Sequence, residues 1–123
     1  MDNSKYTIHM EAGFDFLKLI DVPALIDACT EKWYNQTLCE VNGNLIRLGV
    51  FNEGEFHWHK HDNEDEFFFI LKGELFIEFE DELVVLKPHQ GINVPKGVLH
   101  RPYVKEPTAV IMVEGSTVTP TGD

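Results

Sequence analysis

Short runs of alternating apolar and polar residues, separated by turn-forming residues, cover most of the chain. Such runs are typical of half-buried strands, and their close spacing indicates a small antiparallel sandwich or barrel. Asn42-Gly43 is a strong two-residue hairpin signal, and Lys72-Gly73 interrupts a second, hairpin-like stretch. The pattern predicts an all-β fold with strands at residues 33–41, 44–52, 66–71, 74–79, 82–86, 92–94 and 109–113.

The two ends of the chain depart from this alternating pattern. Residues 1–15 have weak periodicity and could form an arm or an edge strand. Pro23, followed by helix formers as far as Cys29, predicts a short helix. We therefore expect one domain, 1–123, with a barrel core at about 33–113, an N-terminal arm and helix at 1–32, and an irregular tail at 114–123.

Composition narrows the classes of protein and of partner. The 123 residues are 43% hydrophobic, which is enough for one core without disulfides, and the two cysteines are expected to be reduced. The net charge of −11 leaves no basic footprint, so no nucleic-acid partner is expected. We expect no membrane partner either, since no apolar run reaches the roughly 18 residues of a span. With no signal peptide evident at the N-terminus, a cytoplasmic location is the default.

A histidine-rich segment, residues 57–61, carries the most informative chemistry. On a helix, His57 and His61 would face together and His59 would point elsewhere. On a strand, all three would share one face, and the aromatic neighbourhood favours the strand. The turn at residues 62–65 should then bring Glu66 back toward His61 through antiparallel pairing.

A second turn, Pro95-Lys96-Gly97, can aim His100 into the same cavity. Three imidazoles and a carboxylate suit Zn²⁺, Fe²⁺, Mn²⁺, Ni²⁺ or Co²⁺ alike. The alternatives are an exposed polar face and a fortuitous cluster. The four residues jointly favour a metal, and we predict one divalent ion bound by His59, His61, Glu66 and His100.

Other polar residues near the predicted site are assigned as follows. Glu64 and Asp65 are alternatives to Glu66 as the carboxylate ligand, but the preferred interpretation is that they form a solvated acidic turn. Arg101 is expected to be a surface ion-pair residue. His57 is the best candidate for a catalytic general base, although a pocket-lining role and a plain surface role suit it equally.

These residues resemble the two motifs of the cupins. The first runs Gly54, four residues, His59-Lys60-His61, four residues, Glu66, six residues and Gly73, and the second is Pro95-Lys96-Gly97-Val98-Leu99-His100. The resemblance covers about residues 45–113. The sequence departs from the usual motifs where one residue is missing before His59, where His89 replaces a glycine, and where Val104 replaces a frequent asparagine.

The resemblance implies a jelly-roll barrel, the double-stranded β-helix, and a homodimer. More narrowly, residues 58–61, 65–68 and 121–123 look like a group of small single-domain cupins whose members are sometimes labelled sugar-phosphate isomerases. Only Lys60, Lys96 and Arg101 lie near the motifs and no phosphate cradle is visible, which lowers that alternative.

Three functions are compatible with these features. The first is a metal-dependent enzyme acting on a small molecule, dioxygenase-like with iron or manganese and isomerase-like with zinc. The second is a non-catalytic module that binds or senses a small molecule and whose metal is structural. The third is a metal-free structural cupin.

Overall fold

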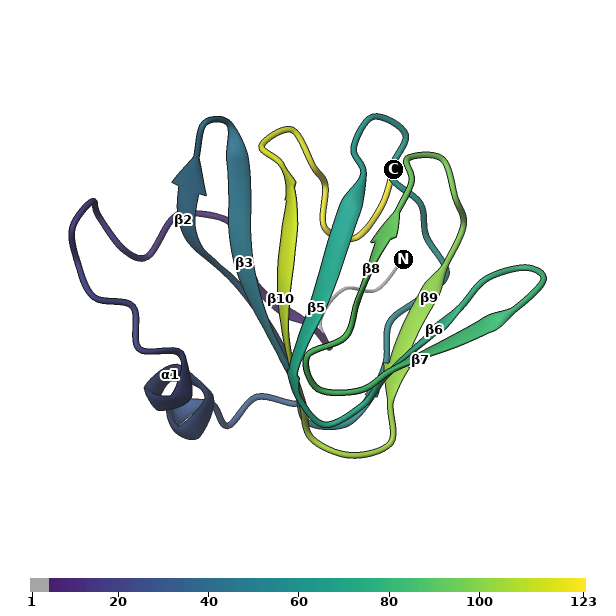
Figure 1. Cartoon of the computed structure of the whole chain (residues 1–123), viewed down its shortest axis with the longest axis horizontal. Coiled ribbons are helices and arrows are strands. Elements are labelled where there is room, and N and C mark those ends of the chain that lie inside the picture. Colours follow the sequence, from purple (N-terminus) through teal and green to yellow (C-terminus); the bar gives the residue numbers. More distant parts are fainter. Residues whose placement is uncertain (1–4) are drawn as a thin grey trace.

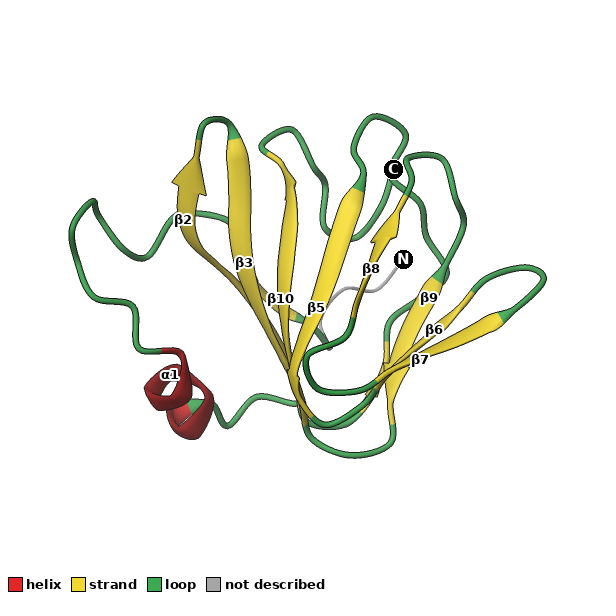
Figure 2. Cartoon of the chain, viewed as in Figure 1, coloured by secondary structure: helices red, strands yellow, loops and turns green. Residues whose placement is uncertain are grey.

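The structure, a computed structural model, describes residues 5–123, so residues 1–4 of the predicted N-terminal arm lie outside the described residues. It consists of strands with one short helix (Figure 2). In chain order the elements are β1 (Thr7–His9), α1 (Val22–Ala28), β2 (Trp33–Val41), β3 (Asn44–Phe51), β4 (Gly54–Glu55), β5 (Glu66–Lys72), β6 (Leu75–Glu78), β7 (Leu83–Leu86), β8 (Gly91–Val94), β9 (Arg101–Val104) and β10 (Thr108–Gly115).

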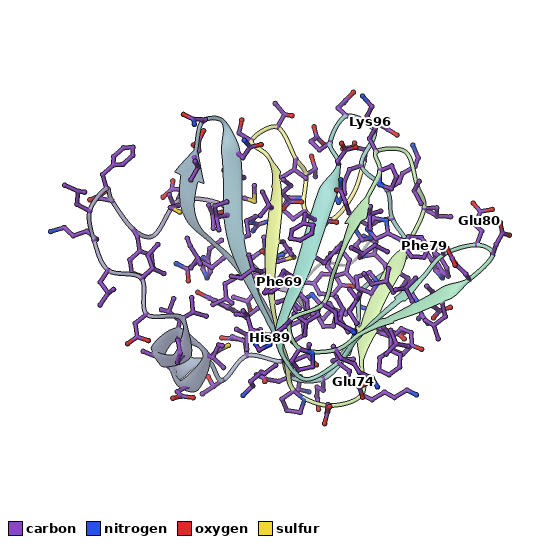
Figure 3. The ribbon with its side chains drawn as sticks, viewed as in Figure 1. Phe69, Glu74, Phe79, Glu80, His89 and Lys96 are labelled. Atoms are coloured by element: carbon purple, nitrogen blue, oxygen red, sulfur yellow. The ribbon has the colours of Figure 1, made fainter. Side chains whose placement is uncertain are left out.

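The strands form two sheets that face each other. The larger has the order β1-β2-β3-β10-β5-β8 and the smaller the order β4-β9-β6-β7. In Figure 1 the two walls converge at one end and diverge at the other, and Figure 3 shows side chains filling the space between them. This arrangement is the jelly-roll barrel with a short N-terminal helix that the sequence predicted.

Local signals account for the hairpin and the helix. Asn42 and Gly43 both have positive φ, 48° and 80°, as a type I′ turn requires, and β2 and β3 pair across them. The side chain of Asp21 caps α1 by accepting a hydrogen bond from the backbone of Ala24, and Pro23 lies in the first turn. The edge strand considered for residues 1–15 exists as β1, which pairs in parallel with β2.

The second predicted hairpin is wrong. β5 and β6 belong to different sheets, because β5 pairs with β8 and β10 whereas β6 pairs with β7 and β9. Gly73, at φ 77°, turns the chain from one sheet to the other where it packs against Pro107 and Thr108. The inward side chains of Ile70 and Leu75 are fully buried on either side of this turn. The alternation of apolar and polar residues therefore continues from β5 to β6, although the two strands belong to the two facing sheets of one core.

The barrel interior is apolar in one part and polar in another. Trp33 and Phe51 stack with ring centroids 4.0 Å apart, and Gly49 provides the space, since a Cβ there would lie 2.4 Å from the Phe51 ring. Further along the strands the inward positions become charged, at Arg47 and Glu114. A separate apolar cluster on the outside of the large sheet packs against α1. No helix in residues 5–123 is long and apolar enough to cross a membrane.

Candidate metal centre

Two backbone segments meet in the barrel and bring two histidines together. Residues 56–61 follow β4 and run beside the chain that leads into β9, and His59 forms an isolated antiparallel bridge with His100. The backbone N–H of each residue donates to the carbonyl oxygen of the other, at 3.0 and 2.9 Å. Directly opposed residues of an antiparallel pair point to the same side. Their rings accordingly lie close together, with centroids 4.3 Å apart.

The turn of the second motif also holds His61. The backbone N–H of Gly97 donates to the carbonyl of His61 at 2.7 Å, and Gly97 has φ 80°, a conformation that favours glycine. Figure 3 places this turn, marked by Lys96, at the end of the barrel opposite Glu74 and His89. The Pro-Gly turn therefore positions the histidine segment as well as the histidine that follows it.

Glu66 reaches the histidines from the opposite wall. It begins β5, which pairs with β8 and β10, so the predicted hairpin between the histidine segment and β5 is wrong. Residues 62–65 instead cross from the small sheet to the large one. A regular strand at residues 56–61 is also wrong, because within that segment His59 alone has a bridge partner. The Glu66 carboxylate therefore reaches the histidines across the barrel interior, from the facing sheet. It is not their neighbour in a strand ladder.

The four predicted ligands do converge. One ligand atom from each of His59, His61, Glu66 and His100 lies within 4.8 Å of the others, and all four residues are buried. Oε1 of Glu66 is 3.5 Å from Nε2 of His61 and 3.4 Å from Nε2 of His100. These residues could hold one metal ion.

Backbone carbonyls orient two of the rings. Nδ1 of His59 lies 3.0 Å from the carbonyl oxygen of His57, and Nδ1 of His100 lies 2.9 Å from that of Val98. Because a carbonyl only accepts, Nδ1 carries the hydrogen and donates it in both rings, and Nε2 is left with a lone pair. Histidines that bind metals are commonly held in this way.

Several atoms at the centre are buried without a partner. Within residues 5–123, neither ring nitrogen of His61 has a hydrogen-bond partner, nor does Oε1 of Glu66 or Nε2 of His100. The contacts of 3.4 and 3.5 Å are longer than a charge-assisted hydrogen bond, about 2.7–2.9 Å. They are close to the separation of roughly 2.9–3.4 Å between atoms that each lie about 2.1 Å from one ion. The residues therefore fit a divalent metal.

The charges of the cluster also suit metal binding. Burial and the neighbouring His100 lower the pKa of His59 to about 3, so this ring is neutral at neutral pH. Burial disfavours the charged form of His61, but Glu66 outweighs burial and raises the pKa of His61. Burial likewise opposes ionisation of Glu66, yet the nearby imidazoles of His100 and His61 lower its pKa. His61 is therefore the candidate ligand at which a proton would compete with a metal ion.

A buried ion pair behind the cluster was not predicted from the sequence. Arg47 is fully buried and donates to Oε1 of Glu114 at 3.2 Å, to Thr37 Oγ1 at 3.0 Å and to the backbone carbonyl of His9 at 3.3 Å. Glu114 lies directly opposite Glu66 in the β5–β10 ladder. Burial and the negative charge of Glu66 raise the pKa of Glu114 to about 9. The guanidinium of Arg47 is therefore the buried positive charge that both carboxyl groups share.

A signal for this pair is present in the alternation of two strands. Leu45, Arg47, Gly49 and Phe51 occupy one face of β3, and the face that carries Phe51 is the inner one. A charged residue at an inward position must be paired or bound to something. Glu114 stands in the same relation to the inward-facing Met112 of β10.

The remaining candidate residues lie outside the four-residue cluster. Nδ1 of His57 is 3.2 Å from the hydroxyl of Tyr6, and its Nε2 is 2.5 Å from the carbonyl oxygen of Thr121. Glu64 does not belong to a solvated turn. It is buried under the turn that follows β10, and it accepts a hydrogen bond from Thr117 in that turn. Asp65 is exposed, as expected, and accepts from the backbone of Lys96.

The surface role predicted for Arg101 is confirmed. Its guanidinium forms ion pairs with Glu55, at 2.7 Å, and with Glu78, and both carboxylates are partly exposed. Its side chain also lies over the ring of Trp58. Arg101 therefore points away from the neighbouring His100.

The C-terminal segment lies across the histidine segment. The backbone N–H of Asp123 donates to the carbonyl of Lys60 at 2.9 Å, and its carboxylate accepts from the backbone of Asp62 at 2.6 Å. Gly122 packs so closely that a Cβ there would lie 2.6 Å from Cβ of His59. The C-terminal tail, which was predicted to be irregular, therefore packs against the histidine segment and covers the site.

The buried ion pair generates a prediction about stability. Replacing Arg47 by Met leaves Glu66 and Glu114 without their buried cation and should lower the free energy of unfolding by about 3–5 kcal/mol. Arg101→Met is the matched control, since it breaks exposed pairs and should cost less than about 1 kcal/mol. Urea unfolding of the two variants measures both values. Equal losses of unfolding free energy in the two variants would show that the buried Arg47–Glu114 pair contributes no more to stability than the exposed pairs of Arg101.

Comparison with known proteins agrees with this geometry. Residues 50–114 match the family model described as a cupin domain. The uncharacterized protein YdbB of Bacillus subtilis is 42% identical over 85 residues, which cover 68% of this chain and 74% of that protein.

Solved structures show the same fold. A cupin-2 domain containing protein from Shewanella frigidimarina is 31% identical with a TM-score of 0.74, and the match covers 79% of this chain and 94% of that one. KdgF from a Halomonas species, at 18% identity and a TM-score of 0.64, covers 69% of this chain and 81% of its own and shows the fold alone. Taken with the two motifs and the two-sheet barrel, these matches show that the chain belongs to the cupin family.

Proposed function

We propose that His59, His61, Glu66 and His100 bind one divalent metal and that the protein uses it to act on a small molecule. The observation that carries this proposal is the set of buried, unpartnered nitrogen and oxygen atoms that converge within 4.8 Å. Leaving such atoms unpaired costs about 1–3 kcal/mol each, and one shared ion would serve Oε1 of Glu66, Nε2 of His100 and one ring nitrogen of His61 together. Zn²⁺, Fe²⁺, Mn²⁺, Ni²⁺ and Co²⁺ all suit this donor set.

The chain's own residues define what such a site can do. A bound metal would supply Lewis-acid or oxygen chemistry to a coordinated molecule. Arg47 and Glu114 form a buried pair beside Glu66 on the neighbouring strands, and the carbonyls of His57 and Val98 hold two imidazoles, so these two rings are oriented before anything binds. The docked C-terminal segment limits the access of water.

The catalytic role expected for His57 stays a prediction. Nε2 faces the carbonyl oxygen of Thr121 and therefore donates, which leaves Nδ1 as the basic nitrogen. The hydroxyl of Tyr6 engages Nδ1, so the ring can accept a proton from a substrate only when the contact with Tyr6 is broken. His57→Ala with full turnover on an identified substrate would remove it from the role of general base. The engaged ring is also the observation that favours the second candidate function, a non-catalytic binding or sensing module. Oxygen consumption and isomerisation assays against panels of small molecules separate the two.

A sugar-phosphate substrate is a weaker proposal. The cavity beside the centre has no lysine or arginine in its lining, and Arg47 is already paired with Glu114. A phosphate needs such cations or a cradle of backbone amides. A cytoplasmic location also stays a prediction, in keeping with the free thiols of Cys29 and Cys39.

Metal content tests the central proposal. Protein purified without a chelating tag and reconstituted should hold about one divalent ion per chain, and His59→Ala should lower its affinity by tenfold or more. His89→Ala is the control, because His89 lies on a turn at the other end of the barrel. Mass spectrometry of the dissolved metal gives the stoichiometry. Metal that stays absent after reconstitution, with His59→Ala behaving like the wild type, would favour a metal-free structural cupin.

The raised pKa of His61 predicts a pH dependence of metal affinity. A protonated imidazole cannot coordinate, so metal must displace a proton from His61 at pH values below its pKa. His59, with a pKa of about 3, adds no such competition near neutral pH. The apparent affinity should fall about tenfold per pH unit below the His61 pKa and level off above it. Competition with an indicator chelator measures this, and a pH-independent affinity would contradict it.

We also propose that the protein forms a homodimer through residues 10–20. Phe16, Leu17 and Leu19 are 91%, 104% and 86% exposed on a loop that projects from the barrel (Figure 1). Phe16 and Leu17 form part of the wall of a groove of about 530 Å³, which Phe14, Ile20 and Val41 also line. A two-fold axis would place this apolar surface of one copy against the same surface of the other.

Light scattering during size-exclusion chromatography tests the dimer. The wild type should elute with twice the mass of one chain, and Leu19→Asp should elute as a monomer because it places a charge in the apolar contact. Val85→Asp, at an exposed apolar position on β7, should stay dimeric. A wild type that is monomeric at every concentration would refute the interface.

A further inference from the structure

One of the three candidate histidine ligands lacks the support that the other two have. Nδ1 of His59 and Nδ1 of His100 each face a backbone carbonyl oxygen, at 3.0 and 2.9 Å. His61 is 2% exposed, yet neither of its ring nitrogens has a hydrogen-bond partner within residues 5–123. Its Nε2 faces Glu66 at 3.5 Å, on the side of the proposed metal. Nδ1 of His61 is therefore a buried group that requires a partner behind the ring.

Glu64 is a buried residue with the complementary need. It is 7% exposed although it lies between the histidine segment and β5. Its Oε2 accepts a hydrogen bond from Oγ1 of Thr117 at 2.6 Å, whereas its Oε1 is buried and has no partner in the described part of the chain. A buried carboxylate served by a single hydroxyl is unfavourable unless another donor or a cation reaches it.

The charge of Glu64 already acts on His61, which lies three positions before it in the chain. Burial opposes the charged form of His61, but three carboxylates raise its pKa, and Glu64 is one of them. The other two are Glu66, which faces Nε2, and Asp123, which is exposed and already accepts from the backbone of Asp62. Glu64 is therefore the carboxylate that is both buried and free to serve Nδ1.

We propose, resting on the metal function above, that Glu64 positions His61 for coordination. When Nε2 of His61 is a metal ligand, the ring keeps its hydrogen on Nδ1 and donates it to Oε1 of Glu64. This one hydrogen bond satisfies two buried atoms that otherwise lack partners. A carboxylate behind a coordinating imidazole fixes the orientation of the ring and raises its basicity. Glu64 is thus a positioning residue and not a ligand.

The charged acceptor distinguishes His61 from the other two imidazoles. Hydrogen bonds to a carboxylate are roughly twice as strong as those to a neutral carbonyl oxygen, which is the acceptor for His59 and His100. Thr117 holds the other oxygen of Glu64 and so fixes the direction of the carboxylate. The turn that follows β10 thereby supports the site, although none of its residues is a candidate ligand.

Zinc affinity tests this role at a pH above the pKa of His61, where no proton competes for the ring. Glu64→Leu should weaken zinc binding about tenfold or more, the usual effect of removing such a carboxylate. Glu64→Gln should lose less, because its amide oxygen can accept from Nδ1 while its NH₂ group donates to Thr117. Asp62→Leu is the control: its carboxylate is exposed and pairs with Lys60, so the affinity should stay unchanged.

Nuclear magnetic resonance of isotope-labelled, zinc-loaded protein gives a readout that a merely structural role would not move. Each coordinating imidazole keeps one ring N–H, and the ring N–H of His61 should resonate furthest downfield because its acceptor is charged. In Glu64→Gln this signal should move upfield, since the acceptor becomes neutral. The ring N–H signals of His59 and His100 should keep their positions, because their carbonyl acceptors are unchanged.

The outcomes separate this inference from the metal proposal. Protein that takes up no zinc overturns both. Zinc-loaded protein in which Glu64→Leu binds as tightly as Asp62→Leu, or in which the His61 signal does not move in Glu64→Gln, overturns the role of Glu64 alone. If Glu64→Leu does not fold, the signal of His61 in Glu64→Gln decides the question.

Discussion

The enclosure of four polar side chains inside an apolar barrel is the constraint on which the rest of the structure depends. His59 and His100 are fixed by a backbone bridge, Glu66 faces them from the other sheet, and their facing atoms have too few partners among the described residues. Burial without pairing is unfavourable, so the surrounding elements must hold these groups in place. The Gly97 turn, the carbonyls behind the rings and the docked C-terminal segment all do so.

Much of the fold could be predicted from local signals. Asn42-Gly43 determines the β2–β3 hairpin because few other residues adopt positive φ twice in succession, and Asp21 and Pro23 mark the start of α1. Pairing between distant strands could not be predicted in the same way. The alternation around Gly73 is the same whether the chain returns along its own sheet or crosses to the facing one, and here it crosses.

The candidate site shows the same division. The spacing of the two motifs was enough to identify four residues that converge in the structure, His59, His61, Glu66 and His100, although the expected route by which Glu66 joins them was wrong. The supporting residues were missed because they come from β3 and β10, outside the motif residues. The supporting role of Arg47 and Glu114 can be recognised only when the alternation of their strands shows that both side chains point inward. Glu64 is buried by a turn that lies far from it in the sequence.

The metal is the feature that every proposed activity needs. An X-ray structure with anomalous data recorded at the absorption edges of candidate metals tests the account most directly. It should show one anomalous peak about 2.0–2.3 Å from the three imidazole nitrogens and the Glu66 carboxylate. Ordinary water at that point, in protein crystallised after reconstitution with metal, would contradict the account.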